Sequence, residues 1–193
     1  MSFCFIAGKC RLVCAGKKNT FLFALLLASA GLFAQAKKTT SATVSFDAST
    51  PIDPVAKAEN KTVIAAVDPK TGSVAFEASV KNFAFENKKV EEHFNAERWL
   101  NSEKFPKFSF KGKIDDLKKV NFKKDGTYNV NVSGDLTVKE TTKPISTPAT
   151  ITIKGGKISA TAGFNVNLPS FGVMADGKKI ATDAKVIVAA DLN

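Results

Sequence analysis

The chain has 193 residues, a formal net charge of +10 at pH 7 and three cysteines, all within its first 14 residues. The 157 residues after Ala36 are enough for one domain, and its stability must come from an apolar core because no cysteine remains for a disulfide or a thiolate site. Removing the four basic residues of 1–36 lowers the net charge from +10 to +6, and this excess is dispersed lysine with Arg98 as the one arginine. A nucleic-acid-binding protein needs a clustered basic face, so that class is excluded, whereas weak attraction to an anionic membrane surface stays open.

Residues 1–36 have the features of an export signal. Lys17 and Lys18 supply the positive start, residues 21–34 form an apolar run, and Ala34 and Ala36 are the small residues that a signal peptidase requires. The run has 14 residues, whereas a transmembrane helix needs about 20, so a retained anchor is the less favoured alternative. We predict cleavage after Ala36 and a periplasmic or secreted domain over 37–193. The long lead-in before Lys17 suggests that Met1 is a mis-called start.

Alternation of apolar and polar residues predicts eight strands after the signal. In chain order they cover 42–46, 62–67, 73–81, 107–114, 128–138, 145–153, 158–168 and 184–192. Turn residues at 68–72 and 154–157 predict tight hairpins, and Gly134 within the longest strand indicates a bulge or a sharp bend. Each strand is apolar on one face only, so the sheet must close into an antiparallel barrel or pack as a sandwich.

Residues 87–100 are the exception to this alternation. Val90, Phe94 and Leu100 are not spaced by two, and the Glu and Ala residues between them favour a helix. We expect one or two helical turns near 88–98, lying over one end of the barrel.

Residues that could carry catalysis are scarce. His93 is the one histidine of the chain, and it has neither a nucleophile elbow nor further metal ligands near it in the sequence. We therefore expect no catalytic residue, metal or cofactor, and we interpret His93 as a structural hydrogen-bonding residue. A hydrolase that uses a carboxylate pair, Glu91-Glu92 or Asp115-Asp116, is the remaining enzyme hypothesis.

Phenylalanine is abundant at the inward positions of the predicted strands. Eleven of the 16 phenylalanines follow Ala36. An eight-stranded barrel has an interior just wide enough to pack solid or to hold one small ligand, so the pattern leaves an ordinary core and a lined cavity both open.

Three blocks of the sequence resemble the YceI-like family. The first joins Glu92-His93-Phe94 to residues 102–110 (SEKFPKFSF), the second joins residues 134–137 (GDLT) to 142–144 (TKP), and the third is residues 164–173 (FNVNLPSFGV). Their order and spacing agree with the family over nearly all of 40–192. The chain departs from the family pattern between these two parts of the second block, where Lys139-Glu140-Thr141 replaces the usual His or Gly. We expect residues 142–144 to form a turn.

This resemblance implies an exported, all-β, eight-stranded antiparallel barrel similar to lipocalins. Its apolar lumen would bind an isoprenoid or other long-chain lipid, of the polyprenyl phosphate or quinone type, for transport or storage. Lys143 or Lys178 at the mouth would pair with a phosphate head. The alternative is a solid β-domain with a structural or stress-response role and no ligand. The candidate lumen residues are Phe76, Val80, Phe85, Phe108, Phe110, Tyr128, Val130, Val132, Leu136, Phe164, Val166 and Phe171.

Overall fold

The structure is a computed structural model that describes residues 36–193, so the predicted signal peptide, apart from Ala36, lies outside the described residues. Its elements are β1 (Lys37–Asp47), β2 (Lys57–Val67), β3 (Ser73–Ser79), η2 (Val80–Asn82), β4 (Ala84–Phe85), α1 (Lys88–Asn95), β5 (Lys107–Ile114), η3 (Leu117–Lys119), β6 (Gly126–Val138), β7 (Thr141–Lys154), β8 (Lys157–Asn167), η4 (Leu168–Phe171) and β9 (Asp183–Leu192). No helix within 36–193 is both long enough and apolar enough to cross a membrane.

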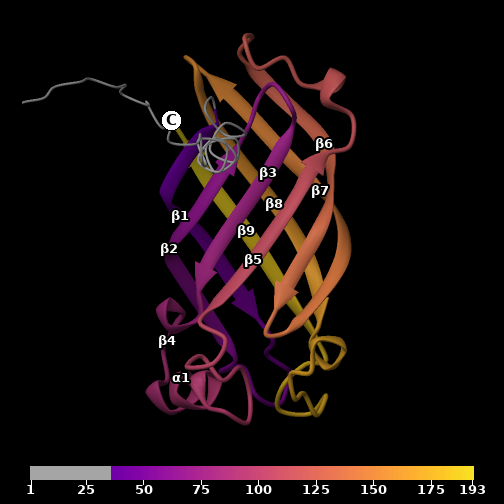
Figure 1. Cartoon of the computed structure of the whole chain (residues 1–193). Coiled ribbons are helices and arrows are strands. Elements are labelled where there is room, and N and C mark those ends of the chain that lie inside the picture. Colours follow the sequence, from indigo (N-terminus) through magenta and orange to yellow (C-terminus); the bar gives the residue numbers. More distant parts are fainter. Residues whose placement is uncertain (1–35) are drawn as a thin grey trace, which may run out of the picture. The chain divides into compact units, whose positions relative to one another are not determined.

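Eight of the strands close into an antiparallel barrel, which confirms the predicted fold class (Figure 1). Around the ring they follow the order β1, β2, β3, β5, β6, β7, β8 and β9, and β1 closes the ring by pairing with both β2 and β9. The short β4 pairs with β2 outside this ring. Closure leaves no free sheet edge along most of the barrel, which gives the backbone donors and acceptors their partners.

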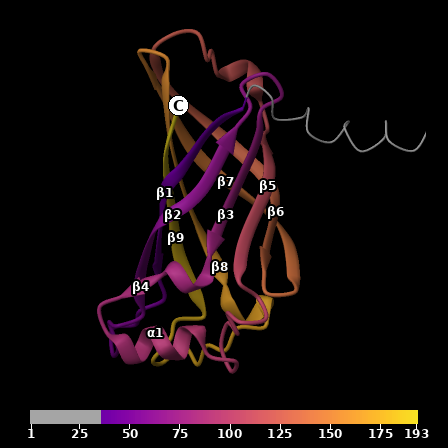
Figure 2. The same cartoon turned by 60° about the vertical axis from the view of Figure 1, so that its left-hand side comes forward.

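The helical segment lies where the sequence predicts it, at one end of the barrel (Figure 2). The side chain of Asn87 accepts a hydrogen bond from the backbone N–H of Lys89 and so caps α1. The helix ends at Asn95, earlier than the predicted residue 98, and the chain continues to Phe105 through turns that are closed by backbone hydrogen bonds to Ala96 and Asn101.

The faces of the strands follow the predicted alternation. On β6, Val130, Val132, Leu136 and Val138 are buried, whereas the residues between them are exposed or half-buried. The hairpin between β7 and β8 turns at Gly155 and Gly156, whose φ angles of 57° and 77° suit glycine.

The structure around Gly134 corrects the prediction of a bulge at this residue. The ladder between β5 and β6 runs through Gly112 and Gly134 without a change of register, so there is no bulge. A β-carbon on Gly134 would overlap the Cα of Gly112 and the carbonyl oxygen of Lys111. Glycine is required here because the two backbones approach each other too closely for a side chain.

The prediction of a turn at residues 142–144 is also corrected. It lies inside β7 rather than in a turn, and the reversal is at Lys139, with φ 55°, and Glu140. The ladder from β7 to β8 ends at Ala149, so the stretch with Pro144 and Pro148 pairs with β6 alone. Proline is tolerated there because no second strand is present to require the N–H that proline lacks.

Candidate functional site

The interior of the barrel contains two apolar cavities. The first has a volume of about 70 Å³ and includes residues of α1 in its lining, and we call it the α1-side chamber. The second has a volume of about 80 Å³ and lies toward the other end, and we call it the distal chamber. Both cavities are lined by fully buried residues together with half-buried strand residues such as Phe46, Phe76 and Phe164.

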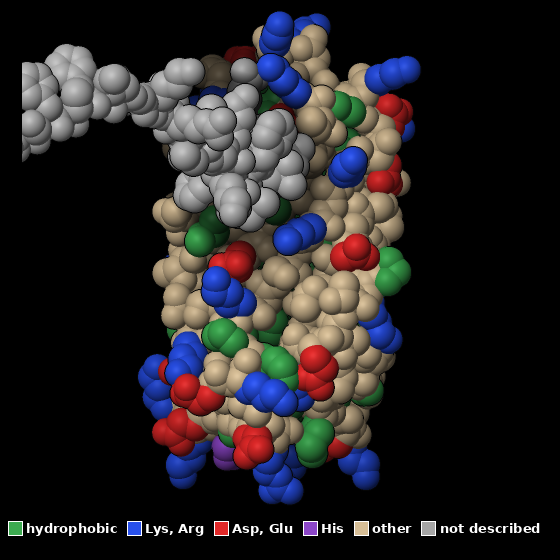
Figure 3. Space-filling view, in the orientation of Figure 1, with side chains coloured by type: hydrophobic (Ala, Val, Ile, Leu, Met, Phe, Trp, Pro, Cys, Tyr) green, Lys and Arg blue, Asp and Glu red, His purple; other side chains and the backbone are tan. Residues whose placement is uncertain are grey.

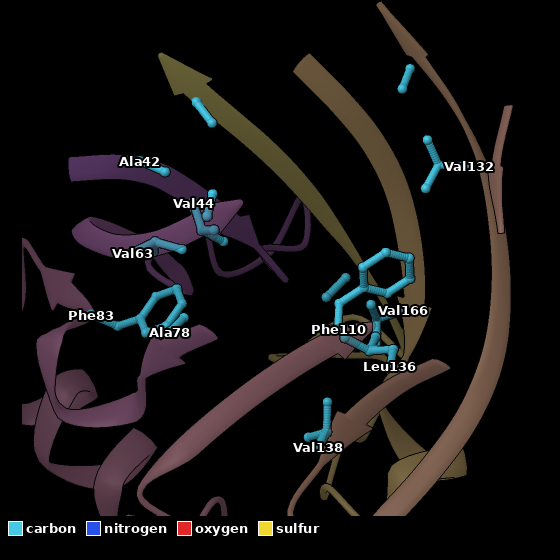
Figure 4. Packing of buried hydrophobic residues seen from close by; sticks show 14 of the residues in the cluster. Ala42, Val44, Val63, Ala78, Phe83, Phe110, Val132, Leu136, Val138 and Val166 are labelled. Carbon is cyan, nitrogen blue, oxygen red and sulfur yellow. The ribbon is translucent and has the colours of Figure 1, made fainter. Parts of the chain in front are cut away.

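The α1-side chamber is lined by Val44, Phe46, Phe76, Ala78, Phe83, Phe94, Trp99, Leu100, Phe108, Leu136, Val138, Phe164, Val166, Leu168, Val173 and Val186. The distal chamber is lined by Ala65, Ala66, Val67, Val74, Ala75, Phe76, Phe110, Val132, Ile145, Thr147, Ala149, Ile151, Ala160, Thr161, Ala162, Phe164, Val188, Ala190 and Leu192. Figure 4 shows Phe110, Leu136 and Val166 lying close together in the interior.

Seven of the twelve predicted lumen residues line these chambers. They are Phe76, Phe108, Phe110, Val132, Leu136, Phe164 and Val166. Together they come from β3, β5, β6 and β8, so the barrel brings side chains from distant parts of the sequence into one interior.

The other five predicted lumen residues lie elsewhere. Val80 and Val130 are buried but line neither chamber. Phe85 packs on Phe94 with ring centroids 4.8 Å apart, and the hydroxyl of Tyr128 donates to the carbonyl of Lys124. Phe171 is buried beneath the ammonium of Lys143. Alternation identifies the inward face of a strand but does not show how far along the barrel a cavity extends.

Phe94 anchors the cover of the α1-side chamber, and sequence reasoning did not place it there. Its side chain is 1% exposed, and it forms edge or tilted contacts with four rings at centroid distances of 4.8 to 5.8 Å. These rings belong to Phe46, Phe83, Phe85 and Trp99. An eight-residue helix is unstable by itself, so this contact, worth about 2–3 kcal/mol, holds α1 on the barrel. The aromatic residue at 94, within a segment that does not alternate, is the signal that could have revealed this anchor.

A set of polar contacts joins the segments around this cover. The indole N–H of Trp99 donates to the carbonyl of Met174 at 2.6 Å. The Lys139 ammonium donates to the carbonyls of Trp99 and Gly172, both at 3.2 Å. Lys139 therefore connects the turn between β6 and β7 to the two segments that flank the α1-side chamber.

Lys143 is the predicted headgroup residue that lies nearest to a chamber. It is half-buried, lies on the inward-facing set of β7 and stands opposite Leu136, which lines the α1-side chamber. Its ammonium lies 5.8 Å from the ring centroid of Phe171. Lys178 is exposed on the loop after η4, and its backbone is held by Thr50 and Asp176.

The same loop is organised by Asp176. One oxygen of this carboxylate accepts the backbone N–H groups of Lys178, Lys179 and Ile180 at 2.8 to 3.0 Å. These bonds, of which that from Ile180 contributes most, lower the pKa of Asp176 to about 2.

His93 does not act as a structural hydrogen-bonding residue, which corrects that interpretation. Its side chain is exposed on α1 and makes no hydrogen bond to any residue of 36–193. The physical reason is its place in the helix, because the buried face of α1 is taken by Phe94.

One carboxylate of each pair named in the hydrolase hypothesis makes structural contacts. Glu91 accepts the backbone N–H of Phe85 and pairs with Lys88, and Asp115 accepts the Ser133 hydroxyl. Within 36–193, no group of three or more His, Cys, Asp and Glu side chains could hold a metal ion. Around the barrel end that bears α1, basic and acidic side chains are interspersed (Figure 3).

Comparisons with known proteins agree with this geometry. The family model described as a YceI-like domain matches residues 32–192, and none of the curated proteins matches the sequence. BcnA of Burkholderia cenocepacia has a TM-score of 0.66 at 18% identity, covering 79% of this chain and 96% of its own.

Two further solved structures share the fold. One is a polyisoprenoid binding domain from Saccharophagus degradans implicated in plant cell wall breakdown, with a TM-score of 0.70 at 9% identity, covering 82% of this chain and 97% of that one. The other is the YceI protein of Campylobacter jejuni, with a TM-score of 0.54 at 16% identity, covering 68% and 80%.

Proposed function

Because this chain belongs to the YceI-like family, we propose that it is exported and that its barrel holds the hydrocarbon chain of an isoprenoid or similar lipid, for transport or storage. The observation that carries the proposal is the lining of the two chambers, which is almost entirely aliphatic and aromatic. Likeness to a polyisoprenoid binding domain of another organism supports the class of ligand.

The polar groups of the interior favour a ligand that is hydrocarbon inside the barrel. The inward-facing hydroxyl of Thr147 already donates to the carbonyl of Gly163 at 2.8 Å. A polar group within a bound chain would find no free partner there and would cost about 1–3 kcal/mol. Each buried methylene of a hydrocarbon chain contributes about 0.8 kcal/mol instead, so a few isoprene units are sufficient for tight binding.

Lys143 is our candidate for the residue that pairs with an anionic headgroup. A polyprenyl phosphate is the type of ligand whose headgroup suits this lysine best. Lys143 is half-buried beside the α1-side chamber, whereas Lys178 is exposed on a loop. We expect Lys143→Ala to weaken binding of farnesyl phosphate more than binding of farnesol. Lys178→Ala is the matched control, and an equal loss in both variants would contradict the assignment.

Export rests on the sequence of residues 1–36, with its apolar run and the small residues Ala34 and Ala36. N-terminal sequencing of the protein from the cell envelope is expected to begin at Lys37. An N-terminus at Met1 in that fraction would contradict cleavage.

The small volumes of the chambers favour one alternative, a packed β-domain without a ligand. Native mass spectrometry of the protein purified from its own periplasm, followed by organic extraction, separates the two. A co-purifying species of polyprenyl or quinone mass supports lipid binding. A bare protein that also takes up no added farnesol or geranylgeraniol would contradict it.

A further inference from the structure

The two chambers share two lining residues, Phe76 and Phe164. Phe76 lies on β3 and Phe164 on β8, and three strands separate them in either direction around the ring. The two phenyl rings therefore come from opposite walls and stand between the chambers. Any chain that occupies both chambers must pass these rings, from whichever end it enters.

The volumes of the two chambers show that a long chain must use the passage between them. An apolar cavity of about 150 Å³ takes up one benzene molecule, and each chamber has about half that volume, 70 and 80 Å³. Neither chamber as it stands holds more than a short piece of hydrocarbon. A long chain can be accommodated only when the side chains between the chambers move and the two cavities join.

The two rings differ in how firmly they are held. The ring of Phe76 stacks on that of Phe110, its cross-strand neighbour, with centroids 5.4 Å apart and planes inclined by 17°. Phe164 has no aromatic partner within residues 36–193, and its ring is half-buried. The ladder between β7 and β8 also stops at Ala162, two residues before Phe164. Phe164 is thus the less constrained of the two.

We propose that Phe76 and Phe164 form an internal gate that selects ligands by chain length, with Phe164 as the part that moves. This inference rests on the proposed function. A chain that fills one chamber leaves the gate in place, whereas a longer chain must displace the Phe164 ring and lose its packing. The gate therefore lowers the affinity for long chains relative to short ones, and its removal should relieve that penalty.

The test compares three isoprenoid alcohols of increasing length, geraniol, farnesol and geranylgeraniol, on protein expressed from the full chain. Binding is followed by the fluorescence of the single tryptophan, Trp99, which lines the α1-side chamber. We expect Phe164→Ala to raise the affinity for geranylgeraniol relative to geraniol by about tenfold, the equivalent of two more buried methylene groups. The milder Phe164→Val should shift the ratio in the same direction if the alanine variant does not fold.

The matched control is Phe108→Ala. Phe108 is also inward and half-buried, but it lines the α1-side chamber alone. Its loss enlarges one chamber without joining the two, so the ratio of affinities should stay within about twofold of wild type because no new methylene sites become continuous. An equal change of the ratio in Phe164→Ala and Phe108→Ala would overturn the gate while leaving lipid binding intact. Failure of all variants and of wild type to bind any of the alcohols would overturn the proposed function itself.

Discussion

The direction of a single side chain decides whether a charge is tolerated in this barrel. Val130 and Asn129 are neighbours on β6, yet Val130 is 6% exposed inside the barrel and Asn129 lies on its outer surface. The amide oxygen of Asn129 accepts the Thr150 hydroxyl, an interaction that a carboxylate oxygen can also make.

We expect Val130→Asp to lower the free energy of unfolding by about 3 kcal/mol or more, because an unpaired carboxylate is then buried. Asn129→Asp adds the same charge outside and should change stability by less than about 0.5 kcal/mol. Urea unfolding of the two variants measures both effects. Equal stability of the two proteins would contradict the inward position of Val130, and a larger loss in Asn129→Asp would show that the faces of β6 are reversed.

Asp176 makes the loop after η4 sensitive to acid. Its pKa of about 2 lies below its ordinary value of 3.8, so its hydrogen bonds stabilise the folded state above pH 4 and are lost as the pH falls toward 2. We expect Asp176→Ala to lower the melting temperature at pH 6. At pH 2.5 the melting temperature of the variant should approach that of the wild type. Asp135→Ala, which removes a carboxylate from the outer surface of β6, is the control. A difference between Asp176→Ala and wild type that persists unchanged at pH 2.5 would contradict this role.

At the scale of the element, α1 depends on one side chain. Phe94 contributes the buried surface of the helix and touches Trp99, so Phe94→Ala should cost about 3–5 kcal/mol and release the cover of the α1-side chamber. Trp99 would then contact water, and its emission should shift to longer wavelength. Phe122→Ala, at a half-buried site outside both chambers, should leave the emission unchanged. An unshifted emission in Phe94→Ala would mean that α1 is held by other contacts.

The close approach of β5 and β6 makes a second prediction at this scale. Gly134→Ala places a methyl group against the backbone of Gly112 and should destabilise the protein by about 1–3 kcal/mol. Gly163→Ala is the control, since a β-carbon there lies 3.9 Å from its nearest neighbours. Thermal unfolding of both variants tests this, and a Gly134→Ala protein as stable as the control would contradict the close approach.

At the scale of the whole molecule, closure of the ring couples the ends of the described chain. β1 pairs with both β2 and β9, so the last strand cannot leave without opening the barrel. We expect residues 37–193 to unfold in one cooperative step. Unfolding followed by Trp99 emission, which reports on the α1 end, and by far-ultraviolet circular dichroism should give one transition midpoint. Two midpoints would show that the α1 end unfolds separately.

The local pattern of the sequence determined the eight strands, their inward faces, the hairpins and the helical segment. These features depend on neighbours within a few residues, as in the alternation of β6 or the paired glycines at 155 and 156. The packing of Phe94 against four rings and the wrong interpretation of His93 mark the limit of that pattern. Which side of α1 is buried depends on the barrel end against which the helix packs, and that contact is not local in the sequence.

Strand alternation left a barrel and a sandwich both open, and the structure confirms the barrel that the family resemblance implied. Tertiary structure alone decided between a bulge and a close contact at Gly134. It also decided which inward residues meet a cavity and that Phe76 and Phe164 stand opposite each other. The physical reason is that cavities and close approaches arise from the spacing between strands that are distant in the sequence. Alternation sets the side of the sheet on which a residue lies, whereas the closure and register of the whole ring set which residues it faces across the interior.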